Sequence, residues 1–186
     1  MIDTDALCSQ VPGMTAPVEL RWLHDHAASS PAAVVEVGCS AGRSTIALAL
    51  GARTTGKTVY AVDPFNGGGA TPDPPGNYIN QGASFKPFWA NLCRFGVQDT
   101  VTPIGDYSEL AAKKYPGDRI GLLFIDADHT YRYVRMDVDI WGRFLVPGGI
   151  LALHDSGYPG VRQVINELGS GYADKEELPI FHARKV

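Results

Sequence analysis

Short, continuous apolar runs alternate along this chain with segments whose apolar residues recur at helical spacing. A short apolar run is typical of a strand buried on both faces, and apolar positions three and four apart are typical of an amphipathic helix. The pattern predicts strands over residues 32–37, 58–62, 100–104, 121–125 and 150–153. It predicts helices over residues 17–28, 44–51, 85–95, 107–115, 133–145 and 161–168.

The order of these elements predicts the fold class. Strands that alternate with helices form parallel pairs joined by right-handed crossovers. The tail, residues 172–185, reads as a β-hairpin that turns at Leu178-Pro179. We therefore expect an α/β protein with a Rossmann-like, doubly wound, mostly parallel sheet of seven strands that ends in a C-terminal antiparallel hairpin. Residues 1–186 form a single domain in this interpretation, with an N-terminal helical segment over residues 1–30.

One region interrupts the alternation. Residues 64–83 are rich in glycine, proline and asparagine and contain no periodic apolar pattern. A long loop within a small domain is usually functional or disordered. We predict that residues 64–83 form a lid over a bound ligand.

Composition and charge narrow the classes of function. A chain of 186 residues can bury a large core, and its formal net charge of −4 offers no basic surface for nucleic acid. The three cysteines, Cys8, Cys39 and Cys93, are far apart, which disfavours a disulfide framework and a zinc ribbon. The sequence shows neither a signal peptide nor a membrane span. These features predict a cytoplasmic protein without nucleic-acid or membrane partners, and they are compatible with a homo-oligomer.

Residues 51–58, GARTTGKT, satisfy the Walker A pattern of nucleotide triphosphatases. A phosphate-binding loop must follow a strand and open a helix, so that backbone N–H groups converge on phosphate. Here the predicted helix precedes the motif and the predicted strand follows it. We therefore interpret residues 51–58 as an ordinary loop between a helix and a strand.

A second glycine-containing motif has the right context. Residues 36–44, EVGCSAGRS, follow the first strand and open the next helix. The spacing of Gly38 and Gly42 differs from the G-x-G-x-x-G dinucleotide fingerprint, which disfavours NAD. Asp63 ends the second strand, where an acidic residue can accept hydrogen bonds from both hydroxyls of a ribose. Together with Glu36, these residues describe a nucleoside site without a pyrophosphate, although Asp63 could instead cap a loop.

Acidic and imidazole side chains follow two later strands. The strand over residues 121–125 runs into Asp126, Asp128 and His129, and the strand over residues 150–153 runs into His154 and Asp155. The two strands are joined by a helix and are therefore parallel, so both polar groups lie at the carboxyl edge of the sheet. Open α/β sheets bind ligands at this edge.

Four motifs, in order, resemble a known family. VVEVGCSAGRST, VYAVDPF, LLFIDADHTY and PGGILALHDS look like the class I S-adenosylmethionine-dependent methyltransferases. Within these, they resemble the bacterial branch that includes macrolide-sugar O-methyltransferases and the cephalosporin-biosynthesis methyltransferase. The resemblance extends over residues 13–186. It implies an S-adenosylmethionine-dependent O-methyltransferase that acts on a hydroxyl of a small molecule, a sugar or another natural product.

The resemblance also implies roles for cofactor-binding residues. Their candidates are Glu36, Gly38, Ser40, Gly42, Ser44, Asp63, Asp106 and Asp126. Gly38 and Ser40 would line the methionine moiety, and Ser44 would reach its carboxylate. Asp63 would hold the ribose, and Asp106 would lie near the adenine amino group. Ser44 could instead be an ordinary serine at a helix start, and Asp106 could be a helix N-cap.

Metal-dependent members of the family hold Mg²⁺ at the ends of the fourth and fifth strands. Asp126 and Asp155 match these ligands, whereas His154 stands where the family usually has a carboxylate or an amide. Mg²⁺ prefers oxygen, and imidazole suits Mn²⁺, Zn²⁺ or Fe²⁺. We expect Mg²⁺ or Mn²⁺ held by Asp126, His154 and Asp155. In the alternative, Asp126 contacts only the cofactor amine and His154 stacks in the strand end.

The resemblance gives His129 the position of the catalytic base, next to Asp126 as the second catalytic residue. Asp128 is the rival base, or it caps the following helix. The reaction would be an in-line displacement on the sulfonium methyl, with the acceptor oxygen held close to it. The alternative function is a non-methylating cofactor-binding module, or an isomerase or cyclase with the same fold.

Overall fold

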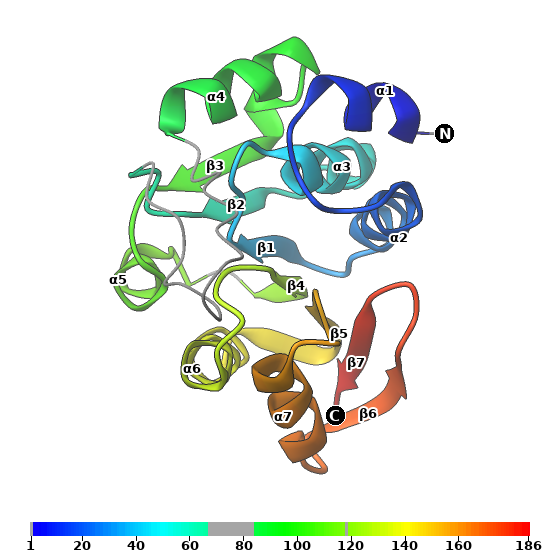
Figure 1. The fold of residues 1–186 in the computed structure, drawn as a ribbon, viewed down its shortest axis with the longest axis vertical. Helices are drawn as coiled ribbons and strands as arrows, with labels where there is room; N and C mark the ends of the chain where they lie inside the picture. The colour runs from blue at the N-terminus through cyan, green and yellow to red at the C-terminus, as the bar shows by residue number, and fades with distance from the viewer. Residues whose placement is uncertain (1, 67–83, 118) are drawn as a thin grey trace.

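The computed structural model describes residues 2–66, 84–117 and 119–186, and within them a seven-stranded sheet lies between helices (Figure 1). The strands are β1 (Ala33–Val37), β2 (Val59–Val62), β3 (Val101–Ile104), β4 (Ile120–Ile125), β5 (Leu145–Leu153), β6 (Tyr172–Glu176) and β7 (Phe181–Lys185). The helices are α1 (Thr4–Gln10), α2 (Pro17–Ala28), α3 (Arg43–Ala52), α4 (Phe85–Arg94), α5 (Ser108–Lys114), α6 (Tyr131–Trp141) and α7 (Pro159–Glu167).

The strand order is β3-β2-β1-β4-β5-β7-β6. Strands β1 to β5 are parallel, and β7 is antiparallel to both β5 and β6. This confirms the predicted fold class, including the C-terminal hairpin. β1 pairs with β2 on one side and with β4 on the other, so the direction of winding reverses between β1 and β4. In doubly wound sheets, ligands bind at the carboxyl ends of the strands where this reversal occurs.

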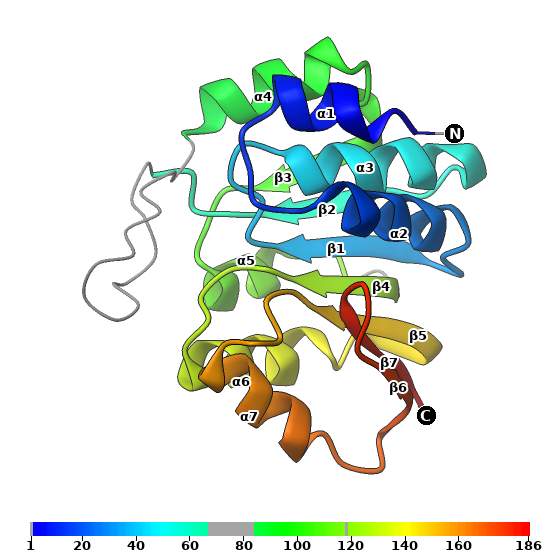
Figure 2. The same ribbon diagram turned by 45° about the vertical axis from the view of Figure 1, so that its right-hand side comes forward.

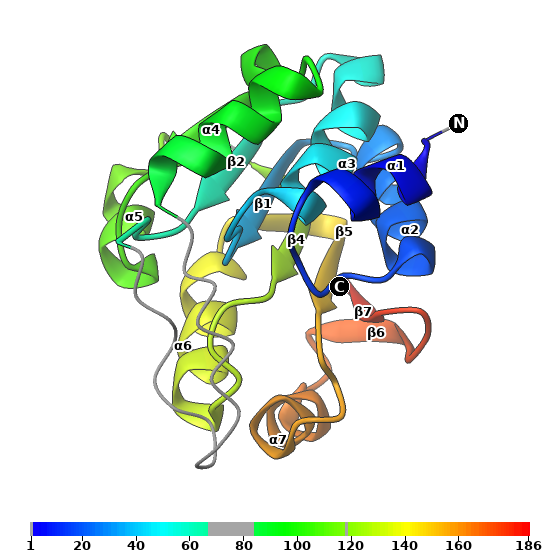
Figure 3. The same cartoon turned by 45° about the horizontal axis from the view of Figure 1, so that its top comes forward.

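Both faces of the sheet are covered by helices, as Figures 2 and 3 show. All six residues of β4 are buried, which explains its continuous apolar run. Successive side chains point to opposite faces: Leu122 and Phe124 belong to the core under α1 to α4, and Leu123 and Ile125 to the core under α5 to α7. The central strands are therefore fixed from both sides, and their carboxyl ends are held rigidly.

The boundary between α6 and β5 differs most from the sequence prediction. The helix predicted over residues 133–145 ends at Trp141, and Leu145 instead begins β5, where it pairs with Ile120. Residues 147–149 lie inside β5, at an irregularity in its pairing with β4. Leu145 matches the helical spacing, but it is buried in the sheet core. The N-terminal segment contains two helices, and the first, Thr4–Gln10, is too short to show a clear periodic pattern.

The structure also places the remaining loops. Helix α3 leads into the Walker-like motif through a short 3₁₀ turn, Arg53–Thr55, and β2 leaves it, which confirms that this motif is a helix-to-strand loop. Most of the lid predicted over residues 64–83 lies outside the described residues, and only its first three residues are included. Across the described ranges, no helix is both long enough and apolar enough to cross a membrane. The three cysteines are free thiols.

Candidate active site

The turn between β1 and α3 lies directly against the end of β4. Gly38 opens this turn with a positive φ of 89°. Its N–H donates a hydrogen bond to Val62 O at 2.8 Å. A Cβ on Gly38 would lie 2.3 Å from the carbonyl oxygen of Asp126, so only glycine fits here. The backbone of the turn therefore contacts the strand end that carries Asp126.

The carboxylate of Asp63 organises the same turn. Its Oδ2 accepts hydrogen bonds from the N–H groups of Cys39 at 3.2 Å and Ser40 at 3.0 Å. Its Oδ1 accepts one from the N–H of Phe65 at 2.9 Å. Ser40 adopts a left-handed conformation with φ of 44°. The loop-capping role considered for Asp63 is thus present, at the predicted end of β2, and its contact with a ribose stays a prediction.

Glu36 is a buried acidic residue near the end of β1, next to this turn. Its side chain is fully buried, and the hydroxyl of Thr45 donates a short hydrogen bond to its Oε2. Burial raises the pKa of Glu36 to about 8, and hydrogen bonding from Ser44 and Thr45 offsets only part of this effect. Ser44 is itself buried near the start of α3. Glu36 and Ser44 therefore form a buried link between β1 and α3.

Two other predicted cofactor residues have contacts within the protein. Gly42 is the N-cap residue of α3, and a Cβ there would lie 3.1 Å from the ring of Phe88. Asp106 follows β3 and forms an ion pair with Lys114 at 2.8 Å. Its Oδ1 accepts a hydrogen bond from the N–H of Tyr107, which is the N-cap residue of α5. Asp106 is therefore not the N-cap itself.

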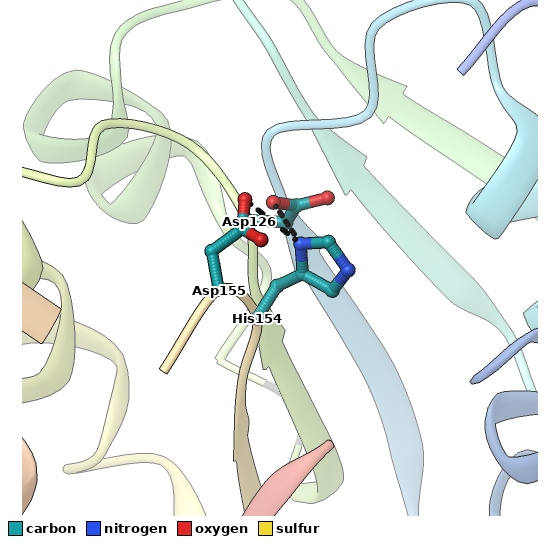
Figure 4. A group of neighbouring side chains, drawn as sticks. All are labelled: Asp126, His154 and Asp155. Carbon is teal, nitrogen blue, oxygen red and sulfur yellow. Dashed lines mark ion pairs between the residues drawn. The ribbon is translucent and has the colours of Figure 1, made fainter. Parts of the chain in front are cut away.

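Four polar side chains meet at the ends of β4 and β5. Figure 4 shows three of them, with the Nδ1 atom of His154 facing the carboxylates of Asp126 and Asp155. This nitrogen lies 3.1 Å from Asp126 Oδ1 and 3.3 Å from Asp155 Oδ2. His129 Nε2 lies 3.1 Å from Asp155 Oδ2 and 3.8 Å from Asp126 Oδ1. The structure thus brings together the metal and base candidates predicted from the sequence.

The charges in this cluster shift the pKa values of its side chains. Burial favours neutral imidazoles, but the close contacts and charges of the carboxylates outweigh it. They raise the pKa of His154 to about 12 and that of His129 to about 9. The two imidazoles in turn hold the pKa of Asp155 well below its usual range. In the metal-free protein, carboxylates and imidazolium groups therefore neutralise one another.

His129 is held on two sides. Its ring stacks on Tyr158, with the ring centroids 4.7 Å apart and the planes inclined by 24°. Its backbone abuts the start of α7, because a Cβ on Gly160 would lie 2.4 Å from the His129 carbonyl oxygen. Asp128 Oδ1 accepts a hydrogen bond from the N–H of Thr130 at 2.7 Å, which fixes the same turn before α6 begins. The turn that presents His129 is consequently rigid.

The cluster fits a divalent cation. Asp126, His154 and Asp155 each offer one ligand atom, and these atoms lie within 4.8 Å of one another. Nδ1 of His154 is buried and, among the described residues, makes no hydrogen bond with acceptable geometry. Nδ1 thus lies close to two carboxylates without a well-formed hydrogen bond to either, an arrangement that a cation between them would suit. The ring of His154 also lies edge-on to Phe124, so stacking in the strand end contributes to its position.

The sequence analysis missed one member of the site, Glu19. It projects from the first turn of α2, and its Oε2 lies 3.3 Å from Nε2 of His154. The same oxygen accepts a hydrogen bond from the N–H of Ala16 at 2.6 Å. A glutamate three residues after the N-cap is an ordinary helix-start signal, which gave no indication of a contact with a strand more than a hundred residues later.

A cavity of about 230 Å³ opens beside this cluster. Glu19, His154 and Asp155 line it on one side, and the turn between β6 and β7, including Glu177 and Leu178, lines it on the other. The cavity is large enough for part of a small molecule. It leaves open space next to His154 and Asp155.

Comparisons with known proteins identify the family and agree with the fold. Residues 35–156 match the model of a family described as a methyltransferase domain. The O-methyltransferase NovP superposes with a TM-score of 0.75 at 13% identity, covering 94% of this chain and 83% of NovP. CalS11, a TDP-rhamnose 3'-O-methyltransferase of calicheamicin biosynthesis, gives 0.61 at 19% identity, covering 89% and 77%. An O-methyltransferase from Bacillus cereus gives 0.66 at 14% identity, covering 98% and 90%.

Proposed function

The chain belongs to the S-adenosylmethionine-dependent methyltransferases, and on that premise we propose that it methylates a hydroxyl group of a small molecule with the help of a divalent cation. The observation that carries the proposal is the contact between the two halves of the site. The glycine turn of the cofactor half touches the strand end of Asp126, which also belongs to the polar cluster. The names of NovP and CalS11 support a hydroxyl acceptor, and that of CalS11 a sugar.

The cofactor half of the site would hold S-adenosylmethionine, which supplies an electrophilic sulfonium methyl when bound. Gly38 and Ser40 present turn backbone at the sheet edge, and Asp63 organises that backbone through its hydrogen bonds. Rotation of the Asp63 carboxylate would allow it to accept from a ribose hydroxyl as well. A turn that is already ordered binds its ligand with a smaller loss of conformational entropy.

Asp126, His154 and Asp155 would hold the cation, which lowers the pKa of an acceptor hydroxyl when bound. His129 lies 3.1 Å from Asp155 and stacks on Tyr158, and its neutral form, favoured when a cation offsets the carboxylate charge, would remove the hydroxyl proton. Asp126 contacts both imidazoles and keeps them in place. In this arrangement the protein mainly orients the acceptor oxygen for in-line displacement.

The proposal is tested by methyl transfer from S-adenosylmethionine carrying a deuterated methyl. Sugars, catechols and other hydroxylated natural products are incubated with the protein, and mass spectrometry detects one added methyl together with S-adenosylhomocysteine. Chelation should abolish transfer, and Mg²⁺ or Mn²⁺ should restore it. Asp126→Asn should lower the rate at least about 10²-fold, because a cation contributes several kcal/mol to the transition state. Asp99→Asn, in a short turn before β3, is the matched control.

Two results would contradict parts of this proposal. Methyl transfer to nitrogen or carbon acceptors only would refute the hydroxyl acceptor. Full activity after complete removal of divalent ions would refute metal assistance, and the carboxylates would then orient the acceptor directly.

A further inference from the structure

The two ring nitrogens of His154 face different partners. Nδ1 faces Asp126 and Asp155, at 3.1 and 3.3 Å, whereas Nε2 lies 3.3 Å from Glu19 Oε2. The side chain of His154 is only 5% exposed, so water reaches neither nitrogen freely. The imidazole ring thus separates Glu19 from the two aspartates.

When the imidazolium of His154 gives up one of its two protons to bind a cation, the hydrogen bonding of Glu19 decides which nitrogen keeps the other. Its Oε2 already accepts a hydrogen bond from the N–H of Ala16 at 2.6 Å, so this oxygen acts as an acceptor. The hydrogen bond between Glu19 and His154 therefore runs from Nε2–H to the carboxylate.

A proton on Nε2 determines the state of Nδ1. In a neutral imidazole with its proton on Nε2, Nδ1 presents a lone pair. That lone pair would face two carboxylate oxygens, an arrangement that is unfavourable unless a positive charge lies between them. A metal ion at this point would remove the conflict, since Asp126, His154 and Asp155 could each offer it one ligand atom.

We propose that Glu19 is a positioning residue, which fixes the proton of His154 on Nε2 and so presents Nδ1 as a metal ligand. The inference rests on the cation site of the proposed function. Imidazole ligands commonly donate their second N–H to a carboxylate, which orients the ring and strengthens the metal bond. Glu19 provides this carboxylate from α2, whereas the metal-ligand candidates follow β4 and β5.

The anchoring of the N-terminal segment supports this role. The guanidinium group of Arg43, at the start of α3, donates hydrogen bonds to three carbonyl oxygens of the segment before α2, those of Cys8, Val11 and Thr15. α2 then begins with Pro17, which is suited to the first position of a helix. Glu19 is consequently held over His154 by a fixed chain rather than by a free terminus.

Mn²⁺ binding tests the proposal without an assay of turnover. Titration calorimetry of the full chain should show Glu19→Ala binding Mn²⁺ about 10 to 100-fold more weakly than wild type, the usual cost of losing such a partner. Glu19→Gln keeps an acceptor oxygen for Ala16 N–H but loses the charge, and it should fall between the two. Asp25→Asn changes an exposed acid of the same helix and should bind like wild type.

Two further measurements separate positioning from a general structural effect. Long-range ¹H–¹⁵N spectra of the Mg²⁺-loaded wild type should show His154 protonated on Nε2, a signature that Glu19→Ala loses. In a His154→Asn background, Glu19→Ala should no longer weaken Mn²⁺ binding, because its effect passes through the imidazole. Glu19→Gln keeps the test valid if the alanine variant unfolds.

Three results would each contradict a different part of the proposal. Unchanged Mn²⁺ affinity in Glu19→Ala, or a proton on Nδ1 of loaded His154, overturns the role of Glu19 while the cation site stands. A wild-type protein that binds no Mn²⁺ overturns both the cation site and this inference. Weakened binding that persists in the His154→Asn background overturns the action through His154.

Discussion

His129 is the residue on which proton removal depends in our proposal. Asp126 and Asp155 raise its pKa to about 9 in the metal-free protein, so the imidazole is largely protonated at neutral pH. A cation held by the same two carboxylates offsets their charge and should lower this pKa. The acidic limb of the rate profile should therefore lie below pH 9 in the loaded enzyme.

We expect His129→Ala to lower kcat at least about 10²-fold, because general-base catalysis typically contributes 10²–10⁴-fold. The affinity for S-adenosylhomocysteine should stay unchanged, and the acidic limb should disappear. Steady-state kinetics over pH with an acceptor from the methyl-transfer screen, together with calorimetry, measure these quantities. His24→Ala, beside the exposed Asp25 on α2, is the control. A fully active His129→Ala enzyme would move the role of base to Asp128 or to metal-bound hydroxide.

Glu36 should set part of the pH dependence of stability. Burial raises its pKa from 4.5 to about 8, so between these values the folded state keeps a proton that the unfolded state has lost. The free energy of unfolding should therefore fall as pH rises through this window, by about 1.4 kcal/mol for each pKa unit of difference and on the order of a few kcal/mol in all.

Glu36→Gln should flatten this dependence, because the amide resembles the protonated acid. Urea unfolding at pH 5, 7 and 9 measures the effect, and the variant should be more stable than wild type at pH 9. Glu109→Gln changes an exposed acid on α5 and should leave the wild-type slope intact. Parallel slopes for wild type and Glu36→Gln would show that Glu36 stays ionised in the folded protein.

At the scale of elements, the start of α7 determines where the His129 turn lies. Gly160 is the second residue of α7, and a Cβ there would lie 2.4 Å from both the His129 carbonyl oxygen and the Tyr131 nitrogen. These are backbone atoms, which cannot move aside as a flexible side chain can. α7 and the turn before α6 are therefore packed backbone to backbone.

Gly160→Ala should destabilise the protein by about 1–3 kcal/mol, the usual cost of overpacking, although alanine is the better helix former. It should also lower kcat, because the displaced turn carries His129. Urea unfolding and kinetics test both effects. Gly169→Ala is the matched control, since no atom lies within 4 Å of its added Cβ. A Gly160→Ala variant that is more stable than wild type would mean that the turn before α6 moves aside without loss of stability.

The sequence predicted most elements because the central strands are apolar on both faces and the helices are amphipathic. It placed Leu145 in a helix because that residue fits the helical spacing of Val138 and Trp141, and periodicity cannot tell which core an apolar residue joins. The short helix α1 lacks the length for a periodic signal.

For the whole molecule, the topology explains which parts of the site were predictable. Parallel strands end at the same edge, so Asp126, His154 and Asp155 could be placed together from their positions after two strands. Glu19 could not, because its contact with His154 depends on how α2 packs over the sheet. The sequence also left open whether Asp63 caps a loop, since that depends on the path of the turn after β1.

The contact between Gly38 and the Asp126 carbonyl has a thermodynamic consequence for the whole enzyme. The backbone of the Gly38 turn packs directly against the backbone at the end of β4. A ligand that shifts this turn would therefore also shift the end of β4 that carries Asp126. Occupancy of one half is then energetically linked to occupancy of the other, and such heterotropic linkage is reciprocal. If the bound ion changes the affinity for the nucleoside by some factor, the bound nucleoside changes the affinity for the ion by the same factor. The coupling would therefore have the same sign and size whichever ligand binds first.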